Sequence, residues 1–404
     1  IIHPDLYEIL AHTEGVVVFH EQVIQIIATM TGVSLATADE KRRSLGDRAG
    51  QQEVCDWFFP AATAKGYELP IIQEIWDVLR AFASFGFCKA HAAAFALPTY
   101  QSAWLKTHYP AAFLAGVLTH DPGMYPKRLI VDEARQMGIT IAPIDVNASD
   151  SVYRVEDHGN AIRIALATVS GISDGEVQSI IAGRPYIDLN DFVRRSGCST
   201  PVTESLILTG GFDSLHADVN RRDLLLHFSD LQKSPSAAVS GAQMNLGFEP
   251  PALISSGLPA MTASESVKYE IDRLGIDMSR HLIEFYGEFL NAIGAVRSSD
   301  LLKQRSQSSV LVAGIKVAMQ TPPVRSGKRV IFLTLDDGYG CSDSTFFTDV
   351  QSEYANVLYS TSLLLVRGVT RRTGARGISI RATGAWDLRA AYESWSAKQS
   401  TLAI

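Results

Sequence analysis

Lys89 and His91 are the first residues whose type and spacing could do chemistry, two positions apart in "GFCKAHAAAFALP" (86–98). They lie where an alanine-rich helix is predicted to begin. A positive side chain near a helix N-terminus adds to the helix dipole, so this pair could hold a phosphate. The alternative for His91 is a hydrogen-bonded histidine of the core. A second cationic pair, Arg42 and Arg43, lies on an earlier predicted helix, where a solvated helix face is the alternative.

Glycine-containing turns form a second candidate site. The stretch "LATVSGISDGEVQSII" (166–181) predicts a helix, a Gly-x-x-x-Gly turn and a second helix, and "VTESLILTGGFDSL" (202–215) is a weaker copy. Such a turn presents backbone N–H groups at a helix N-terminus, where a phosphate of duplex DNA can bind without a lysine. An ordinary corner between helices is the alternative. The residues expected to contact DNA here are Gly171, Ser173, Gly175, Gly210 and Gly211.

Five short β-rich runs from residue 308 onward predict a small barrel with basic loops. Basic loops beside aromatic side chains suit single-stranded nucleic acid, because bases stack on the rings and phosphates pair with arginine. The alternative is that the phenylalanines belong to the core and the arginines to a solvated face. Phe332, inside "VIFLTL", is expected to be core. The loop arginines expected to contact nucleic acid are Arg367, Arg371 and Arg372.

The composition is that of a globular protein with no general affinity for polyanions. Among 404 residues, 36 Lys and Arg stand against 43 Asp and Glu, a net charge of −7, so any nucleic-acid site must be local. The four cysteines lack C-x-x-C spacing, which argues against a zinc site and for a reducing, cytoplasmic compartment. No metal ligand is assigned. No apolar run approaches the ~18 residues of a membrane span.

The predicted fold class is multidomain α+β, because helical patterns give way to strand patterns along the chain. The chain opens with Ile-Ile-His-Pro in place of Met, so a fragment without its N-terminal part is expected. The expected domains are helical fingers (1–125), a connecting segment with helix-hairpin-helix motifs (126–230), a Ser/Pro-rich linker with one helix (231–305), a five-stranded OB-type barrel (306–390) and a tail (391–404).

Several stretches occur in a fixed order that resembles one family. They are "GVVVFHEQV", "ADEKRRSLG", "SFGFCKAHAAAFALPTYQSAWLKTHYPAAFLAGVL", "MGITIAPIDVN", "ATVSGISDGEVQSII" and "VIFLTLDDGYG". They are similar to the fingers, helix-hairpin-helix and OB-fold regions of bacterial C-family DNA polymerases, the polymerase III α-subunit type. The resemblance spans nearly the whole chain and is weakest over 216–300. Because order and content agree together, it is far more specific than any single motif.

The resemblance implies that the helical fingers contact an incoming deoxynucleoside triphosphate. Arg42 and Arg43 match the arginine pair of the family's "ADxxRR", and triphosphate contact is carried over to both. Lys89 and His91 match the family's "GFxKxH" and are expected at the same ligand. Pro98 departs from the family pattern, and it is expected to kink the helix or open its first turn.

The resemblance also implies two Mg²⁺ ions that activate the primer 3′-hydroxyl and stabilise the leaving pyrophosphate. In this family the aspartates that hold them lie in the palm, upstream of the fingers. The chain has no D-x-D motif. No catalytic residue is therefore assigned, and the chain by itself is predicted not to extend a primer.

The linker carries a peptide, "QMNLGF" (243–248), that is similar to the segment with which bacterial polymerases dock in the groove of the sliding clamp. One amide and three apolar side chains on a flexible segment suit such a tether. The alternative is that they cover a neighbouring domain. The residues expected at the clamp are Gln243, Met244, Leu246 and Phe248.

Within the family, the chain looks more like the error-prone branch, because it stops at residue 404, shortly after "AWDLRA". That branch implies DNA repair synthesis across damage together with damage-induced accessory proteins, with primer-template DNA as the main partner. A fragment of a replicative α subunit is one alternative. A non-catalytic DNA-binding scaffold is another, and a helix-hairpin-helix nuclease or ligase module is a third, for which no matching nucleophile or metal cluster is found.

Overall fold

The computed structural model describes residues 1–404 except 83–86, 124, 234–252, 254, 323–328 and 403–404. The chain divides into two compact units, Ile1–Trp104 and Leu105–Ile404. Within the described ranges, every helix is too short or too polar to cross a membrane. The multidomain α+β class predicted from the sequence is confirmed.

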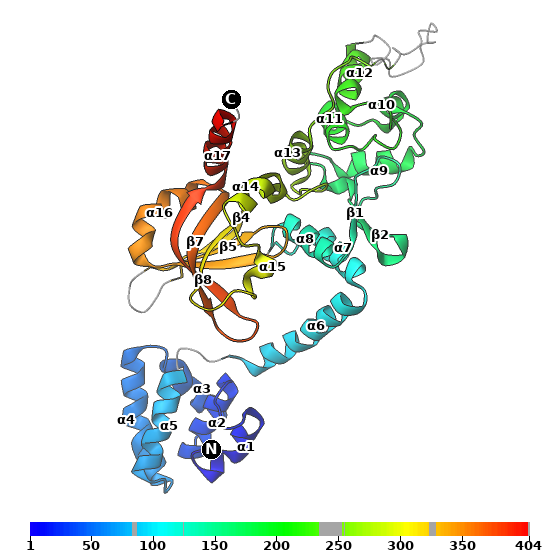
Figure 1. Ribbon diagram of the computed structural model, residues 1–404. Coiled ribbons are helices and arrows are strands. Elements are labelled where there is room, and N and C mark those ends of the chain that lie inside the picture. The colour runs from blue at the N-terminus through cyan, green and yellow to red at the C-terminus, as the bar shows by residue number, and fades with distance from the viewer. Residues whose placement is uncertain (83–86, 124, 234–252, 254, 323–328, 403–404) are drawn as a thin grey trace. The chain divides into compact units, whose positions relative to one another are not determined.

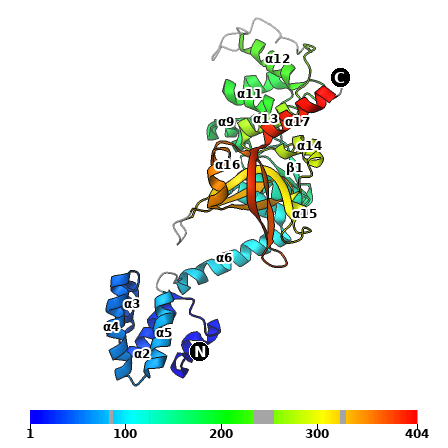
Figure 2. The ribbon, with the colours of Figure 1, turned by 60° about the vertical axis from the view of Figure 1, so that its left-hand side comes forward.

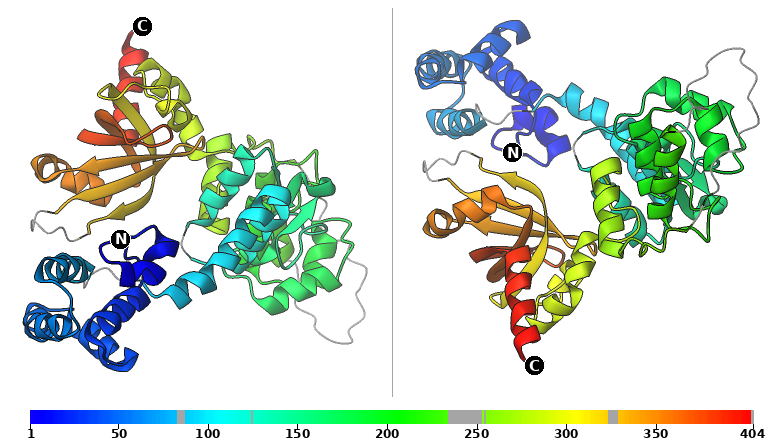
Figure 3. Two further views of the ribbon diagram at one scale, coloured as in Figure 1. Left: turned by 90° about the horizontal axis from the view of Figure 1, so that it is seen from below. Right: turned by 90° about the horizontal axis from the view of Figure 1, so that it is seen from above.

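The first unit is a helical bundle, in which α2 packs against α3 and α4, and α4 against α5 (Figures 1 and 3). In α2 the apolar side chains spaced three and four apart are buried, among them Ile26, Ile27 and Met30, because they share one helix face. The elements are η1 (Pro4–Leu6), α1 (Tyr7–Leu10), η2 (Ala11–Thr13), α2 (His20–Thr31), α3 (Leu35–Ser44), α4 (Arg48–Ala64) and α5 (Leu69–Phe82).

Helix α6 (Lys89–His108) begins in the first unit and ends in the second. It starts at Lys89, as the alanine-rich pattern predicts, and none of its residues is buried. The helix continues through Pro98, which lies ten residues before its last residue. The expectation that Pro98 opens the first turn is therefore wrong.

The second unit opens with α7 (Pro110–His120) and α8 (Lys127–Gln136), which pack beside a small sheet. Strand β3 (Ala161–Arg163) is central in this sheet, parallel to β1 (Thr140–Ala142) and antiparallel to β2 (Arg154–Glu156). The short η3 (Asp157–Gly159) turns the chain from β2 to β3, so these two antiparallel strands form a hairpin. Helix α7 shares the buried core of this unit, through Leu114 and Leu118.

The helix-hairpin-helix region follows. The first of the two helices predicted for residues 166–181 does not form, so that part of the prediction is wrong. Residues 166–168 form only the 3₁₀ turn η4 (Leu166–Thr168), because Val169 is extended (ψ 122°) and Gly171 has a left-handed φ of +81°. Four helices then pack together: α9 (Asp174–Ala182), α10 (Leu189–Ser196), α11 (Thr200–Leu208) and α12 (Arg221–Lys233). Beyond residue 254 the chain continues through α13 (Ala263–Leu274), η6 (Leu282–Tyr286), α14 (Gly287–Ala292) and α15 (Ser298–Leu301).

The predicted barrel is confirmed as a closed five-stranded barrel of order β4-β5-β6-β8-β7. Helix α16 lies between β6 and β7 in sequence and packs on the barrel wall, while α17 follows β8 (Figure 2). This order and helix position are those of an OB-fold. The elements are β4 (Ser309–Gln320), β5 (Ile331–Asp336), β6 (Cys341–Phe346), α16 (Thr348–Ser360), β7 (Leu363–Arg372), β8 (Ile378–Asp387) and α17 (Leu388–Leu402).

Candidate functional site

The starts of α2 and α6 are bound to each other, and the predicted nucleotide-binding cations gather around this junction. Phe19 pairs with Phe87 in a parallel bridge, and the His20 N–H donates to the Phe87 carbonyl at 2.9 Å. The Glu21 carboxylate accepts the Lys89 N–H, with N···O distances of 2.9 and 3.0 Å. Two positive helix ends therefore face one region of the first unit.

Lys89 and Arg42 both approach the first turn of α2. Lys89 Nζ lies 3.3 Å from His12 Nε2 and 5.8 Å from the centre of the Phe19 ring. Arg42 Nη1 lies 3.5 Å from His20 Nδ1, one residue before Glu21. Cations that are 47 residues apart in the sequence are thus brought to one place, which the sequence alone indicates only through the resemblance.

Arg42 and Arg43 share one carboxylate. Asp39 pairs with Arg42 Nη2 at 2.9 Å and with Arg43 Nη2 at 2.7 Å. The hydrogen bond from Arg42 is the main cause that holds the pKa of Asp39 below its usual value. The Arg42 side chain is 22% exposed and that of Arg43 is 73% exposed, so Arg43 has more freedom to reach a ligand.

His91 is exposed on α6, between the rings of Phe87 and Phe95. The ring-centre distances are 5.7 Å to Phe87 and 4.6 Å to Phe95, both edge to face. The alternative of a core histidine is therefore excluded. His91 follows Lys89 by two residues in the first turn of α6, and its predicted contact with a nucleotide stays a prediction.

In the helix-hairpin-helix region, one carboxylate that the sequence analysis missed joins two helix starts. Ser173 is the N-cap of α9: its Oγ accepts the Glu176 N–H, and Glu176 Oε2 in return accepts the Ser173 N–H at 2.9 Å. The other oxygen of Glu176 accepts from Ser199, the N-cap of α11, at 2.9 Å from N and 2.7 Å from Oγ. The bonds from Ser199, followed by those from Ser173, lower the pKa of Glu176 to about 2.

The two glycine turns differ in how much room they leave. A Cβ added at Gly171 would meet no described atom within 4 Å, and one at Gly175 would meet only Ser173 Oγ, at 4.0 Å. In the second copy, the Gly211 N–H donates to the Leu206 carbonyl at 2.7 Å and the Gly210 N–H to the Ile207 carbonyl at 3.2 Å. The second turn therefore uses these amides within its own fold, and DNA contact at both turns stays a prediction.

A groove of about 770 Å³ runs along one side of the barrel. Phe332 and Phe347 line it with 46% and 38% of their surface exposed, and the Arg381 guanidinium lies 5.4 Å from the Phe347 ring centre. The expectation that Phe332 is core is therefore wrong. It alternates with the buried Ile331 and Leu333 along β5, and this period of two places it on the outer face.

The three predicted arginines of the barrel have different surroundings. Arg371 lines the groove. Arg367 lies over the Trp386 ring, 5.3 Å from its centre. Arg372 donates to the carbonyls of Leu302 and Gln304 and so anchors the segment after α15. Of the three, Arg371 is the one the structure places in the groove, together with Arg381. The predicted clamp peptide (243–248) lies outside the described residues.

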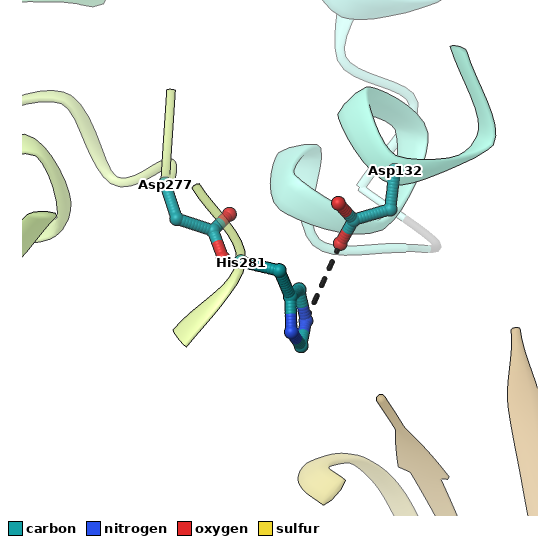
Figure 4. Close-up of side chains that lie close together, drawn as sticks. All are labelled: Asp132, Asp277 and His281. Atoms are coloured by element: carbon teal, nitrogen blue, oxygen red, sulfur yellow. Dashed lines mark ion pairs between the residues drawn. The ribbon is translucent and has the colours of Figure 1, made fainter. Parts of the chain in front are cut away.

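One group of described side chains has donors close enough for a metal ion: Asp132 of α8 with Asp277 and His281 (Figure 4). All three are buried, and their ligand atoms lie within 4.8 Å of one another. His281 Nδ1 accepts the Ile283 N–H at 3.2 Å, so in the neutral ring the proton is on Nε2. That proton faces two carboxylates: Nε2 lies 3.3 Å from Asp336 Oδ2 and 3.5 Å from Asp132 Oδ2. This arrangement leaves Nε2 no lone pair for a metal ion.

Burial and the neighbouring charges act in opposite directions on the pKa values of Asp132, His281 and Asp336. Burial raises the pKa of Asp132 to about 7, although His281 nearby acts in the opposite direction. Burial also raises the pKa of Asp336, but hydrogen bonds from His281 and the Gly338 N–H outweigh it and lower the pKa overall. Asp336 therefore keeps its charge near neutral pH, while Asp132 is close to its midpoint.

Comparison with known families relates two of the regions described above to bacterial DNA polymerases and to a helix-hairpin-helix motif. Residues 1–66 match the family described as the bacterial DNA polymerase III alpha subunit finger domain, and residues 138–224 match the helix-hairpin-helix motif. Fingers and helix-hairpin-helix elements, followed by an OB-type barrel, place the chain in the class of bacterial DNA polymerase III α-type proteins, whose C-terminal part it matches.

Similarity to curated proteins extends over nearly the whole chain. It is 32% identical to an error-prone DNA polymerase of Symbiobacterium thermophilum, over 94% of this chain and 39% of that protein. It is also 32% identical to the DNA polymerase III subunit alpha of Pasteurella multocida, over 91% of this chain and 33% of that protein. The resemblance to bacterial DNA polymerase III α-subunit proteins is confirmed, because these homologues match nearly the whole chain, and the chain spans at most about two fifths of their length.

Proposed function

We propose that this chain is the nucleotide- and DNA-holding part of a DNA-directed DNA polymerase that transfers deoxynucleotides from dNTPs to a primer 3′-hydroxyl. The observation that carries the proposal is the approach of Lys89 and Arg42 to the paired helix starts of α2 and α6. Two helix dipoles and several cations in one region favour a polyanion such as a triphosphate. Arg43 and His91 extend the same surface.

The chemistry itself needs divalent metal ions, for which the part of the chain that the structure describes offers no fitting site. When bound, Mg²⁺ would activate the primer hydroxyl and neutralise the leaving pyrophosphate. Among the described residues, the three-residue group of Asp132, Asp277 and His281 is buried and presents an N–H where a ligand would need a lone pair. No chemical step is therefore assigned to this chain, and its role is to bind and position.

DNA would be held by the second unit. The turn at Gly171 and Gly175 suits duplex phosphates, and the barrel groove with Phe332 and Arg381 suits an unpaired strand. A sliding clamp is the further proposed partner, through residues 243–248, and the cytoplasm is the proposed location. We favour error-prone repair synthesis with damage-induced accessory proteins, supported by the error-prone relatives of S. thermophilum and Bdellovibrio bacteriovorus. A replicative α subunit is the alternative.

The proposal is tested by titrating the 404-residue chain with a fluorescent dATP analogue, the N-methylanthraniloyl derivative. Lys89→Ala and Arg42→Ala are each expected to weaken binding by roughly tenfold, because a charge-assisted phosphate contact contributes about 1.5–3 kcal/mol. Arg80→Ala, which removes an exposed arginine of α5, is the matched control and should bind like wild type. Equal losses in all three variants would indicate nonspecific attraction and contradict the site. Primer extension by the chain alone would contradict its assignment to binding.

A further inference from the structure

A carboxylate occupies the N-terminus of α6, where a phosphate of the proposed nucleotide would otherwise be expected. Both oxygens of Glu21 lie within 3.0 Å of the Lys89 nitrogen, and the Cys88 thiol lies 3.4 Å from Oε1. Glu21 itself lies in the first turn of α2, which begins at His20. One side chain therefore connects the first turns of two helices that are separated by 68 residues in the sequence.

Glu21 stays ionised in this position. Partial burial raises its pKa, but the hydrogen bonds from the Lys89 N–H, from its own N–H and from Cys88 outweigh burial and lower the pKa overall. An ionised acceptor makes a stronger bond to a backbone N–H than a neutral one. The bond fixes the backbone of Lys89, and with it the direction in which the Lys89 side chain leaves the helix.

We propose that Glu21 is a positioning residue of the nucleotide site, which holds the first turn of α6 so that Lys89 points at the triphosphate. This inference rests on the proposed function. Its basis is geometric: Glu21 binds the Lys89 backbone, while Lys89 Nζ lies by the Phe19 ring and by His12. Glu21 and Phe19 are at the start of α2, and His12 is in η2. The backbone and the side chain of Lys89 are thus both held by the segment that runs from η2 to the first turn of α2.

The negative charge of Glu21 also has an effect that would weaken nucleotide binding. A carboxylate close to bound phosphates repels them, so loss of Glu21 would strengthen binding if repulsion were its main effect. Two substitutions separate the effects. Glu21→Gln removes the charge but keeps an oxygen that accepts the Lys89 N–H, whereas Glu21→Ala removes both. Positioning predicts that Glu21→Gln binds at least as well as wild type and that Glu21→Ala binds worse.

The experiment measures the affinity of the 404-residue chain and its variants for the same fluorescent dATP analogue. Glu21→Ala is expected to weaken binding about three- to tenfold. The double variant Glu21→Ala/Lys89→Ala is expected to bind no worse than Lys89→Ala alone, because Glu21 acts through Lys89 and the two losses are not additive. Glu74→Ala, which removes an exposed carboxylate of α5, is the control for net charge and should bind like wild type.

Hydrogen exchange at the Lys89 amide provides a readout that is independent of the nucleotide. Faster exchange is expected in Glu21→Ala and near-native exchange in Glu21→Gln, with the rest of α2 unchanged. Tighter or unchanged binding by Glu21→Ala overturns the inference, and so do additive losses in the double variant, which would indicate a general structural role. Failure of wild type to bind the analogue overturns the proposed function and this inference with it. Wild-type binding with an unaffected Glu21→Ala overturns only the inference.

Discussion

Glu176 shows how a single acidic residue can order the start of two helices in the helix-hairpin-helix region. Its two oxygens accept hydrogen bonds from Ser173 and Ser199, the N-caps of α9 and α11. Each N-cap would otherwise leave N–H groups of the first helical turn unsatisfied. The carboxylate therefore fixes the angle between the two helices as well as the start of each one, and the turn with Gly171 and Gly175 leads directly into this junction.

Replacing Glu176 is expected to destabilise the second unit, and more at neutral than at acid pH. The pKa of Glu176 is about 2 in the folded chain against an ordinary value of 4.5. A lowered pKa stabilises the fold above pH 4.5, and this stabilisation is lost as the pH falls from 4.5 towards 2. Glu176→Gln should lower the free energy of unfolding by about 1 kcal/mol at pH 7, with a smaller difference at pH 3.

Urea unfolding at both pH values measures this difference. Glu204→Gln, which changes an exposed carboxylate of the neighbouring helix α11, is the matched control and should leave the stability nearly unchanged. If Glu176→Gln were as stable as this control at pH 7, the bond between the two helix starts would contribute nothing.

Whether the hydrogen bonds of Glu176 and Glu21 could be predicted depends on how far apart the two bonded residues lie in the sequence. Ser173 and Glu176 form the S-x-x-E spacing of a capping box, which is local and readable. Glu176 accepts a hydrogen bond from Ser199, 23 positions away, and Glu21 accepts one from Lys89, 68 positions away. Both contacts depend on how the helices pack. Such contacts leave no periodic signal in a single sequence.

At the scale of elements, the outer face of the barrel is the proposed surface for single-stranded nucleic acid. The five strands were predictable because β-branched and aromatic residues cluster in short runs between turn residues. The outward placement of Phe332 was not predicted, because the run from 330 to 333 is entirely apolar and shows no alternation in the sequence; only the strand places it outward, between the buried Ile331 and Leu333. The helix expected at residues 166–170 was not formed, because apolar content alone does not separate a helix from an extended segment before a glycine.

Phe332→Ala is expected to weaken the binding of single-stranded DNA by the 404-residue chain. Stacking of a base on an exposed ring contributes about 1–3 kcal/mol, and Phe332 lines the groove beside Arg371 and Arg381. Fluorescence anisotropy with a labelled oligothymidine measures the loss. Tyr359→Ala removes an aromatic ring of α16 that is more exposed than Phe332 but lies outside the groove, and it serves as control. A similar loss in both variants would show that the groove is not the binding surface.

At the scale of the whole molecule, the second unit depends on a buried polar junction between distant segments. Arg135 of α8 donates to Asp132 at 2.6 Å and also to the carbonyls of Asp277 and Met278. His281 connects this group to Asp336, at the end of barrel strand β5. The junction thus joins α8, the segment after α13 and the barrel, so its charge state affects how firmly these parts are held together.

Asp132 is expected to lower the stability of the second unit as the pH rises from about 4 to just above 7, and the upper end of this window is tested between pH 6 and pH 8. Its pKa is raised from 3.8 to about 7, so the folded chain binds a proton that the unfolded chain releases. A raised pKa stabilises the fold fully at low pH, and this contribution is lost as the pH rises through 7. Urea unfolding should show wild type losing about 1.4 kcal/mol between pH 6 and pH 8 relative to Asp132→Asn, which resembles the protonated acid at every pH. Asp300→Asn, an exposed aspartate of α15, should follow wild type. Parallel pH profiles for wild type and Asp132→Asn would mean that Asp132 carries no proton near neutral pH.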